Sequence, residues 1–209
     1  MLISVRHKLV VFAMPKTASN SIAEAIDPYC DIVFRRRPRI RHMPVRKYRR
    51  MIQPLIASFG CRDPETACLF REPVSWLGSW YSYRTRGDIP QAERSTQNMT
   101  FDDFVLAYLD RNPPEFARVG QQSKFVAAED GSIGIDHLYR YEDMAEFLAF
   151  LGRRLGAEIS IGHLNASPRA DLSLAPATRR MLETELARDF EIHASIDRSG
   201  SITPFQSAL

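Results

Sequence analysis

The residues best suited to chemistry lie in a short polar loop near the start of the chain. Residues 15–21 read Pro-Lys-Thr-Ala-Ser-Asn-Ser, between an apolar run at 8–14 and helix-forming residues at 22–26. This order is typical of a strand that enters a helix through a tight loop. The free N–H groups and the dipole of a helix N-terminus attract anions. Lys16 adds a full positive charge, so we expect a phosphate or sulfate group to bind here.

The loop differs from the P-loop of nucleotide kinases, G-x-x-x-x-G-K-[ST], because it has no glycine and its lysine comes first. A lysine that precedes the anion-binding residues of the loop can reach the atom between the bound anion and a second reactant. A capped helix with a solvated lysine explains the same residues, since Ser and Thr are common N-caps. The loop alone leaves both interpretations open.

A second segment favours the binding interpretation. Residues 66–70 form another short apolar run, which ends in Arg-Glu-Pro-Val and a stretch rich in Ser, Trp and Tyr. Pro73 fits the first position of a helix, so Arg71 should stand at the carboxyl end of a strand. Ligands of open α/β sheets bind at these strand ends. Lys16 at one end, and Arg71 with Ser79 at another, therefore predict a ligand with two separate anionic groups.

These two segments resemble the donor-binding motifs of sulfotransferases. Residues 15–21 are similar to the 5′-phosphosulfate loop of that family, and Arg71 with Ser79 is similar to its 3′-phosphate motif. The likeness is greatest to the carbohydrate branch that includes heparan sulfate 2-O-sulfotransferases, and it covers nearly the whole chain. The chain departs from the family at Asn20, where Ser or Thr is usual, and at Glu72, where Asp is common.

The resemblance implies that the donor is 3′-phosphoadenosine 5′-phosphosulfate (PAPS), which carries anionic groups at both ends. The residues implied to hold its 5′-phosphosulfate are Lys16, Thr17, Ala18, Ser19, Asn20 and Ser21. Arg71 and Ser79 would hold the 3′-phosphate, which suits the planar fork of an arginine. Three further residues would close over the donor from the far side: Asn165, Ser167 and Arg169.

His42 is the most informative of the five histidines, because it stands between the two donor motifs. A histidine so placed in the similar branch acts as the base, which implies that His42 takes the proton of the acceptor hydroxyl. Lys16 would stabilise the charge that develops on the bridging oxygen during in-line transfer. A surface or capping histidine is the structural alternative, and Glu72 or another carboxylate would then be the base. We expect no metal, since no His, Cys and Asp cluster has ligand spacing.

Basic residues gather between the two motifs. Nine of the sixteen residues from 35 to 50 are Arg or Lys, although the net charge is only +3. A solvated face is the common explanation of such a run. The functional alternative is contact with the donor phosphates or with an anionic acceptor, either a small molecule or a glycan. Nucleic acid is a weaker alternative, because no recognised nucleic-acid motif accompanies the run.

The chain as a whole has the composition of one enzyme-sized domain, so we expect a single sulfotransferase-like domain over residues 1–209. Its hydrophobic content of 44% and charged content of 25% are ordinary for a globular protein. No apolar run approaches the ~20 residues of a membrane span, and the N-terminus has no pattern of a signal peptide. The three cysteines form no Cys-x-x-Cys pair, which indicates reduced thiols and predicts a cytoplasmic protein.

Apolar runs and their spacing predict the elements that must position these side chains. We expect strands at 8–14, 30–34, 66–70 and 136–141, and helices at 20–27, 44–56, 73–86, 100–110, 143–155 and 176–190. Strands that alternate with helices predict an α/β fold, here a P-loop-like parallel sheet with helices on both faces. Residues 84–99 have loop composition and fit a lid, an acceptor loop or a solvated linker.

Two other classes of function stay open at this point. A P-loop-type nucleotide kinase would share the fold and the strand–loop–helix phosphate site, but it would need carboxylates for Mg²⁺ and a glycine-rich loop. A non-catalytic protein would use residues 35–50 to bind polyanions or nucleic acid. For a sulfotransferase, glycans, lipids, phenols and small metabolites all offer a suitable hydroxyl.

Overall fold

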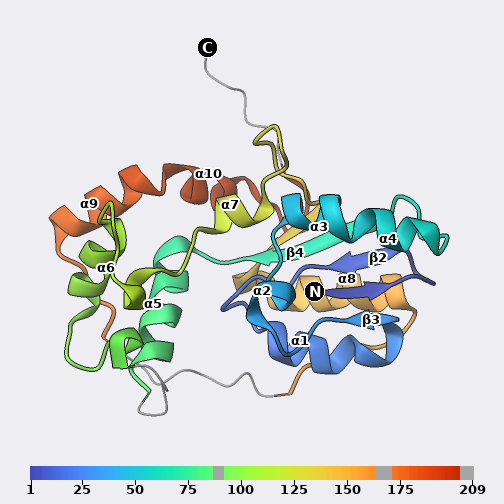
Figure 1. Ribbon diagram of the computed structural model, residues 1–209, viewed down its shortest axis with the longest axis horizontal. Helices are drawn as coiled ribbons and strands as arrows, with labels where there is room; N and C mark the ends of the chain where they lie inside the picture. The colour runs from blue at the N-terminus through green and yellow to red at the C-terminus, as the bar shows by residue number, and fades with distance from the viewer. Residues whose placement is uncertain (87–91, 163–170, 203–209) are drawn as a thin grey trace.

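The computed structural model describes residues 1–86, 92–162 and 171–202, which form an α/β fold with one five-stranded sheet (Figure 1). The strands are β1 (Leu2–Ser4), β2 (Leu9–Val11), β3 (Ile32–Val33), β4 (Glu65–Phe70) and β5 (His137–Arg140). The helices are α1 (Ser19–Ile26), α2 (Pro38–Arg41), α3 (Val45–Met51), α4 (Gln53–Ser58), α5 (Pro73–Arg84), α6 (Phe101–Leu109), α7 (Gln122–Val126), α8 (Met144–Leu155), α9 (Pro176–Glu185) and α10 (Ala187–Ser195). No helix in these ranges is long and apolar enough to cross a membrane.

The sheet is mixed, with strand order β3-β1-β2-β4-β5. β2, β4 and β5 are parallel, while β1 runs antiparallel to both β2 and β3. The prediction of a parallel sheet was therefore wrong for β1, a strand that the sequence analysis did not anticipate. The connection between β1 and β2 contains only residues 5–8, and a parallel crossover needs a dozen or more residues. The four predicted strands correspond to β2, β3, β4 and β5.

Helices cover both faces of the sheet, as predicted. Successive strand residues point to opposite faces, so Cys68 belongs to one hydrophobic cluster and its neighbour Leu69 to another. The first cluster takes side chains from α3, α4, α7 and α10, and the second takes them from α1 and α8. The sheet is thus packed between two layers of helices.

A third hydrophobic cluster lies beyond the carboxyl ends of the parallel strands. It joins α5 to α6 and α9 around the buried Trp76, Phe104 and Leu182, and Figure 1 shows these helices beside one end of the sheet. α6 begins with a capping box, in which Thr100 and Asp103 each accept from the other's backbone N–H. α5 therefore runs from the end of β4 into a separate packed layer.

Two predicted helices are each split in the structure. Residues 44–56 form α3 and α4 with a break at Ile52, because Pro54 lies in the first turn of α4 and has no N–H to continue the helix. Residues 176–190 form α9 and the start of α10. The short helices α2 and α7 were not predicted, since four or five residues are too few to show a helical period.

Candidate functional site

The polar loop after β2 has a strained backbone. Lys16 and Ala18 have φ angles of 65° and 56°, in the left-handed region that residues other than glycine rarely adopt. Thr17 is buried between them, and its hydroxyl donates to the carbonyl of Met14 at 3.0 Å. Ala18 is the N-cap residue of α1, which begins at Ser19. The chain thus turns sharply from the strand into the helix, in the arrangement that the sequence predicted.

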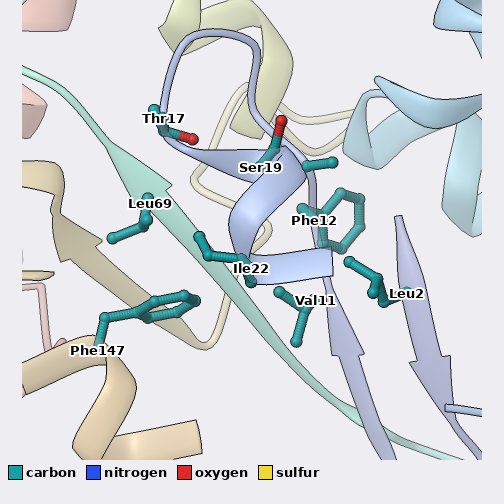
Figure 2. Close-up of a pocket in the computed structure, with 9 residues that line it drawn as sticks. Leu2, Val11, Phe12, Thr17, Ser19, Ile22, Leu69 and Phe147 are labelled. Atoms are coloured by element: carbon teal, nitrogen blue, oxygen red, sulfur yellow. The ribbon is translucent and has the colours of Figure 1, made fainter. Parts of the chain in front are cut away.

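Packing beneath the loop supports this backbone. Figure 2 shows Thr17 and Ser19 above apolar side chains that come from β1, β2, β4, α1 and α8. The apolar residues are Leu2, Val11, Phe12, Ala13, Ile22, Leu69 and Phe147. The hollow between them leaves no room for a water molecule. It is therefore part of the core that holds the loop, rather than a cavity for a ligand.

The backbone N–H groups of the loop are available to a ligand. Within the described ranges, no acceptor in the protein bonds the N–H groups of residues 16–21, and the helical ladder starts with Ile22, which donates to Ala18 at 3.1 Å. These free donors stand at the positive end of the dipole of α1. A left-handed turn that leads into a helix N-terminus is an arrangement that can hold a tetrahedral anion.

The ammonium group of Lys16 lies over two aromatic rings of α5. It is 4.1 Å from the ring centre of Tyr83 and 5.5 Å from that of Trp80. The pKa of Lys16 is lowered to about 8, first by burial and then by the positive charges of Arg86, Arg71 and Arg84. A bound anion would offset this repulsion and favour the charged form.

Arg71 follows the last residue of β4 and contacts the loop directly. Its Nη1 donates to the carbonyl oxygen of Lys16 at 3.1 Å, and its Nε donates to Ser75 Oγ at 2.9 Å. The guanidinium also stacks over Tyr141, 4.4 Å from the ring centre. Because β2 and β4 are neighbouring parallel strands, the two predicted motifs meet at one edge of the sheet.

A buried glutamine that the sequence analysis missed holds the backbone of Arg71. Gln122 accepts from the Arg71 N–H at 3.0 Å and donates to the Arg71 carbonyl at 2.7 Å. The carboxylate of Asp189 in turn accepts from the N–H groups of Gln122 and Ser123, at 3.2 and 3.1 Å. Both Gln122 and Asp189 are buried. No sequence motif marks either residue, because they meet Arg71 only through the packing of α7 and α10.

The first turns of α5 are also fixed to the loop. Trp76 donates its indole N–H to the carbonyl of Pro15 at 2.9 Å. Glu72 is the N-cap residue of α5 and accepts from Ser75 N at 2.7 Å, so its carboxylate has a structural partner. Ser79 stands one turn beyond Ser75 and is partly exposed.

His42 lies beside the same loop. Its Nδ1 is 2.7 Å from the carbonyl oxygen of Ala13, and since a carbonyl only accepts, Nδ1 carries the proton and Nε2 keeps a lone pair. Burial is the main cause that lowers the pKa of His42, and the charges of Arg41 and Lys16 lower it further. The imidazole is therefore neutral at pH 7. The structure brings together Lys16, Arg71 and His42, which lie far apart in the sequence.

The basic run at 35–50 is not one continuous surface. Arg46 donates to the carbonyl of Ala128 at 2.8 Å, Arg41 donates to Ser19 Oγ at 3.0 Å, and Arg35 pairs with Asp27. These guanidinium groups have structural partners. Beside α2, Arg35, Arg36, Arg37 and Arg39 are exposed, and among these only Arg35 has an ion-pair partner in the described part of the chain.

Two predicted segments are described only in part or not at all. Asn165, Ser167 and Arg169, expected to close over the donor, lie outside the described residues. In the described part of the loop at 84–99, Thr96 is buried and donates its N–H to Arg84 and its hydroxyl to Tyr81. This segment folds back onto α5, so Thr96 at least is not a solvated linker residue.

Comparisons of the chain with protein-family models, with curated proteins and with solved structures find no match. The described part of the chain holds no group of three or more His, Cys, Asp or Glu side chains placed to share a metal ion.

Proposed function

We propose that the protein transfers a sulfuryl group from PAPS to an acceptor hydroxyl. The observation that carries this proposal is the hydrogen bond from the Arg71 guanidinium to the Lys16 carbonyl. It joins the two segments that resemble donor-binding motifs into a single cationic site. The strand, loop and helix formed by β2, residues 15–18 and α1 also support a P-loop-like fold at this edge of the sheet.

The residues present suit a donor with an anion at each end. The free N–H groups of residues 16–21 and the ammonium of Lys16 would hold the 5′-phosphosulfate. Thr17 would contribute its N–H alone, because its hydroxyl proton is already donated to Met14. Arg71 and Ser79 would hold the 3′-phosphate, and two of the guanidinium nitrogens of Arg71 already have protein partners. The second N–H of Nη1 and both N–H groups of Nη2, which no described residue accepts, are left for the phosphate.

The chemical step would proceed by in-line displacement. Nε2 of His42 accepts the proton of the acceptor hydroxyl as its oxygen forms a bond to sulfur. The bond between sulfur and the bridging phosphate oxygen breaks, and the electron pair leaves with that oxygen. Lys16 stabilises the negative charge that grows there, more in the transition state than in the ground state. Holding both reactants in attack geometry can contribute about 7–11 kcal/mol.

Transfer of labelled sulfate from PAPS to a panel of acceptors, with the product identified by mass, tests this function directly. Calorimetric titration with the desulfated product, 3′-phosphoadenosine 5′-phosphate (PAP), tests the donor site without an acceptor. We expect PAP to bind the parent chain and a Lys8→Ala control, and to bind Lys16→Ala weakly. Response to ATP–Mg²⁺ without PAP binding would instead favour a nucleotide kinase. Binding of neither nucleotide would favour the non-catalytic, polyanion-binding alternative.

A further inference from the structure

The outer face of α3 and α4 carries a stripe of exposed apolar side chains. Met51, Leu55 and Phe59 are 51%, 48% and 68% exposed and are spaced by four residues. The two helices are nearly continuous, because Ile52 donates to Tyr48 at 2.8 Å across the break. Met51 ends α3, Leu55 lies in α4 and Phe59 is the C-cap residue of α4, so the three exposed side chains follow one another along the pair of helices. The opposite face of these helices is buried in the core through Val45, Tyr48, Ile52 and Ile56.

Such a stripe is unusual within this molecule. In the part of the chain that the structure describes, each of the other large apolar side chains with high exposure stands alone on its element: Ile40, Tyr83, Leu106, Leu172 and Met181. Single exposed apolar residues need no explanation, whereas a contiguous group points to an interaction surface. The stripe is not needed for packing against the sheet, because the opposite, buried face of α3 and α4 makes that contact.

Basic residues border the stripe at both ends. Lys47 stands one turn before Met51 in α3, and the exposed Arg50 directly precedes Met51. Arg62 follows Phe59 and is exposed, and the exposed Asp63 is the acidic residue beside it. Lys8 is exposed as well. It lies close to this end of the stripe, since its carbonyl accepts from the N–H of Glu65 at the start of β4. The exposed Asp31 lies near Lys8, and Glu65 is paired with Arg154, so the four basic residues outnumber the unpaired acidic ones, Asp31 and Asp63, and the surroundings of the stripe carry a net positive charge.

We propose that this face docks on an anionic lipid surface. Met51, Leu55 and Phe59 insert at the boundary between headgroups and acyl chains, and the basic residues contact lipid phosphates, as in amphipathic helices that lie in the membrane interface. Charge complementarity favours this occupant. Three side chains are also too small a patch for a stable protein interface, which buries about 800 Å² on each partner. A lipid surface needs no such matched area.

The end of the docking face at Leu55 and Phe59 is distant from the candidate site along the sheet. α4 ends just before β4 begins, whereas Arg71 follows the last residue of β4. Figure 1 shows α4 and α5 at opposite ends of the sheet. Lipid binding would thus leave the loop of residues 15–21 open, and this proposal stands or fails independently of the proposed function.

Co-sedimentation of the full chain with vesicles tests the proposal. We expect binding to phosphatidylcholine vesicles that contain about one quarter phosphatidylglycerol, little binding to phosphatidylcholine alone, and weaker binding when salt screens the charges. The triple variant Met51→Gln/Leu55→Gln/Phe59→Gln should lose at least about tenfold in partition coefficient. Its control, Leu106→Gln/Met181→Gln, changes two other exposed apolar residues, which are 41% and 47% exposed, and should bind like the parent. Replacing Lys47, Arg50 or Arg62 by Gln should cost about fivefold each.

Three results would overturn the proposal. The first is absence of binding to the anionic vesicles, and the second is equal binding by the parent and the stripe variant. The third comes from sedimentation velocity: a dimer of the parent that the stripe variant loses would assign the stripe to a second copy of the chain. Far-UV circular dichroism checks that the variants are folded, which their exposed positions predict.

Discussion

At the scale of single residues, burial shifts two titratable groups in directions that suit the proposed chemistry. His42 has a lowered pKa and stays neutral at pH 7, so its Nε2 can accept a proton. Lys16 has a pKa of about 8 in a site crowded with arginines, so it is mostly charged at pH 7 yet close to its titration. An anionic donor would stabilise the charged form, and this couples donor binding to the protonation of Lys16.

The first prediction concerns this coupling. In the free protein Lys16 loses its proton as the pH rises through about 8. PAP affinity should therefore fall above that pH, because the neutral amine attracts no phosphate. Calorimetric titrations with PAP below and above pH 8 measure the effect. Lys16→Met should bind weakly with no such dependence, should lose turnover, and should keep its fold, since the side chain fills no core space. The same pH dependence in the parent and in Lys16→Met would assign the titration to another group.

The second prediction concerns the base. His42→Ala should lower kcat by a factor of about 10²–10⁴ and leave PAP affinity nearly unchanged. The parent should lose activity as the pH falls through the lowered pKa of His42, because the protonated imidazole cannot accept a proton. Steady-state kinetics across pH and PAP titrations measure the two effects, with His7→Ala as the control. If His42→Ala weakens PAP binding as strongly as Arg71→Ala, His42 belongs to the donor pocket instead.

At the scale of elements, the position of Arg71 depends on three helices in addition to its own strand. α5 supplies Ser75, α7 supplies Gln122, and α10 supplies Asp189 behind Gln122. Burial raises the pKa of Asp189. Its carboxylate accepts from the first two N–H groups of α7, as the side chain of an N-cap residue would. A guanidinium held at both its backbone and its side chain is pre-organised for an anion, which lowers the entropy cost of binding.

The third prediction tests this arrangement. Gln122→Leu leaves the N–H and carbonyl of Arg71 without their buried partner, which should reduce the free energy of unfolding by about 1–3 kcal/mol. It should also weaken PAP binding, because Arg71 would no longer be held against the loop. Urea unfolding and PAP titration measure the two effects.

The control for this prediction is Ile56→Val, a core substitution near the far end of the sheet that costs about 0.5–1.5 kcal/mol. It should lower stability while PAP affinity stays at the parent value. Gln122→Leu with parental PAP affinity would show that Gln122 serves stability alone.

At the scale of the whole molecule, the segment after α10 returns to the sheet and covers its edge strand. Leu138 in β5 donates its N–H to the carbonyl of Gly200 at 3.0 Å. Gly200 is buried with a φ of 79°, and a Cβ at this position would lie 2.4–2.8 Å from ring atoms of Tyr139. Covering the edge satisfies a strand N–H that would otherwise be open to pairing with another chain.

The fourth prediction follows from this contact. Gly200→Ala should lower the free energy of unfolding by roughly 1–3 kcal/mol or more, because it adds a clash with Tyr139 to the strain of a positive φ. Gly131→Ala isolates the backbone contribution, since Gly131 has a φ of 85° and nothing within 4 Å of an added Cβ. Urea unfolding of both variants makes the comparison. Equal losses would mean that Tyr139 moves aside without cost.

Much of the fold was readable from the sequence because its signals are local. Apolar runs marked β2, β3, β4 and β5, and Pro73 marked the start of α5, which places Arg71 just after the end of β4. The strand–loop–helix around Lys16 was readable for the same reason, since neighbours in the chain decide it. β1 was missed because a strand of three residues, two of them apolar, is too short to distinguish from other buried segments.

Only the tertiary structure decided which side chains meet. The sequence by itself placed Lys16, His42 and Arg71 in three separate segments, and the packing of the strands and helices put His42 on Ala13 and Arg71 on Lys16. It also gave Arg46 a structural partner and left the stripe on α3 and α4 uncovered. These outcomes depend on contacts between residues far apart in the chain, which local propensity and periodicity do not encode.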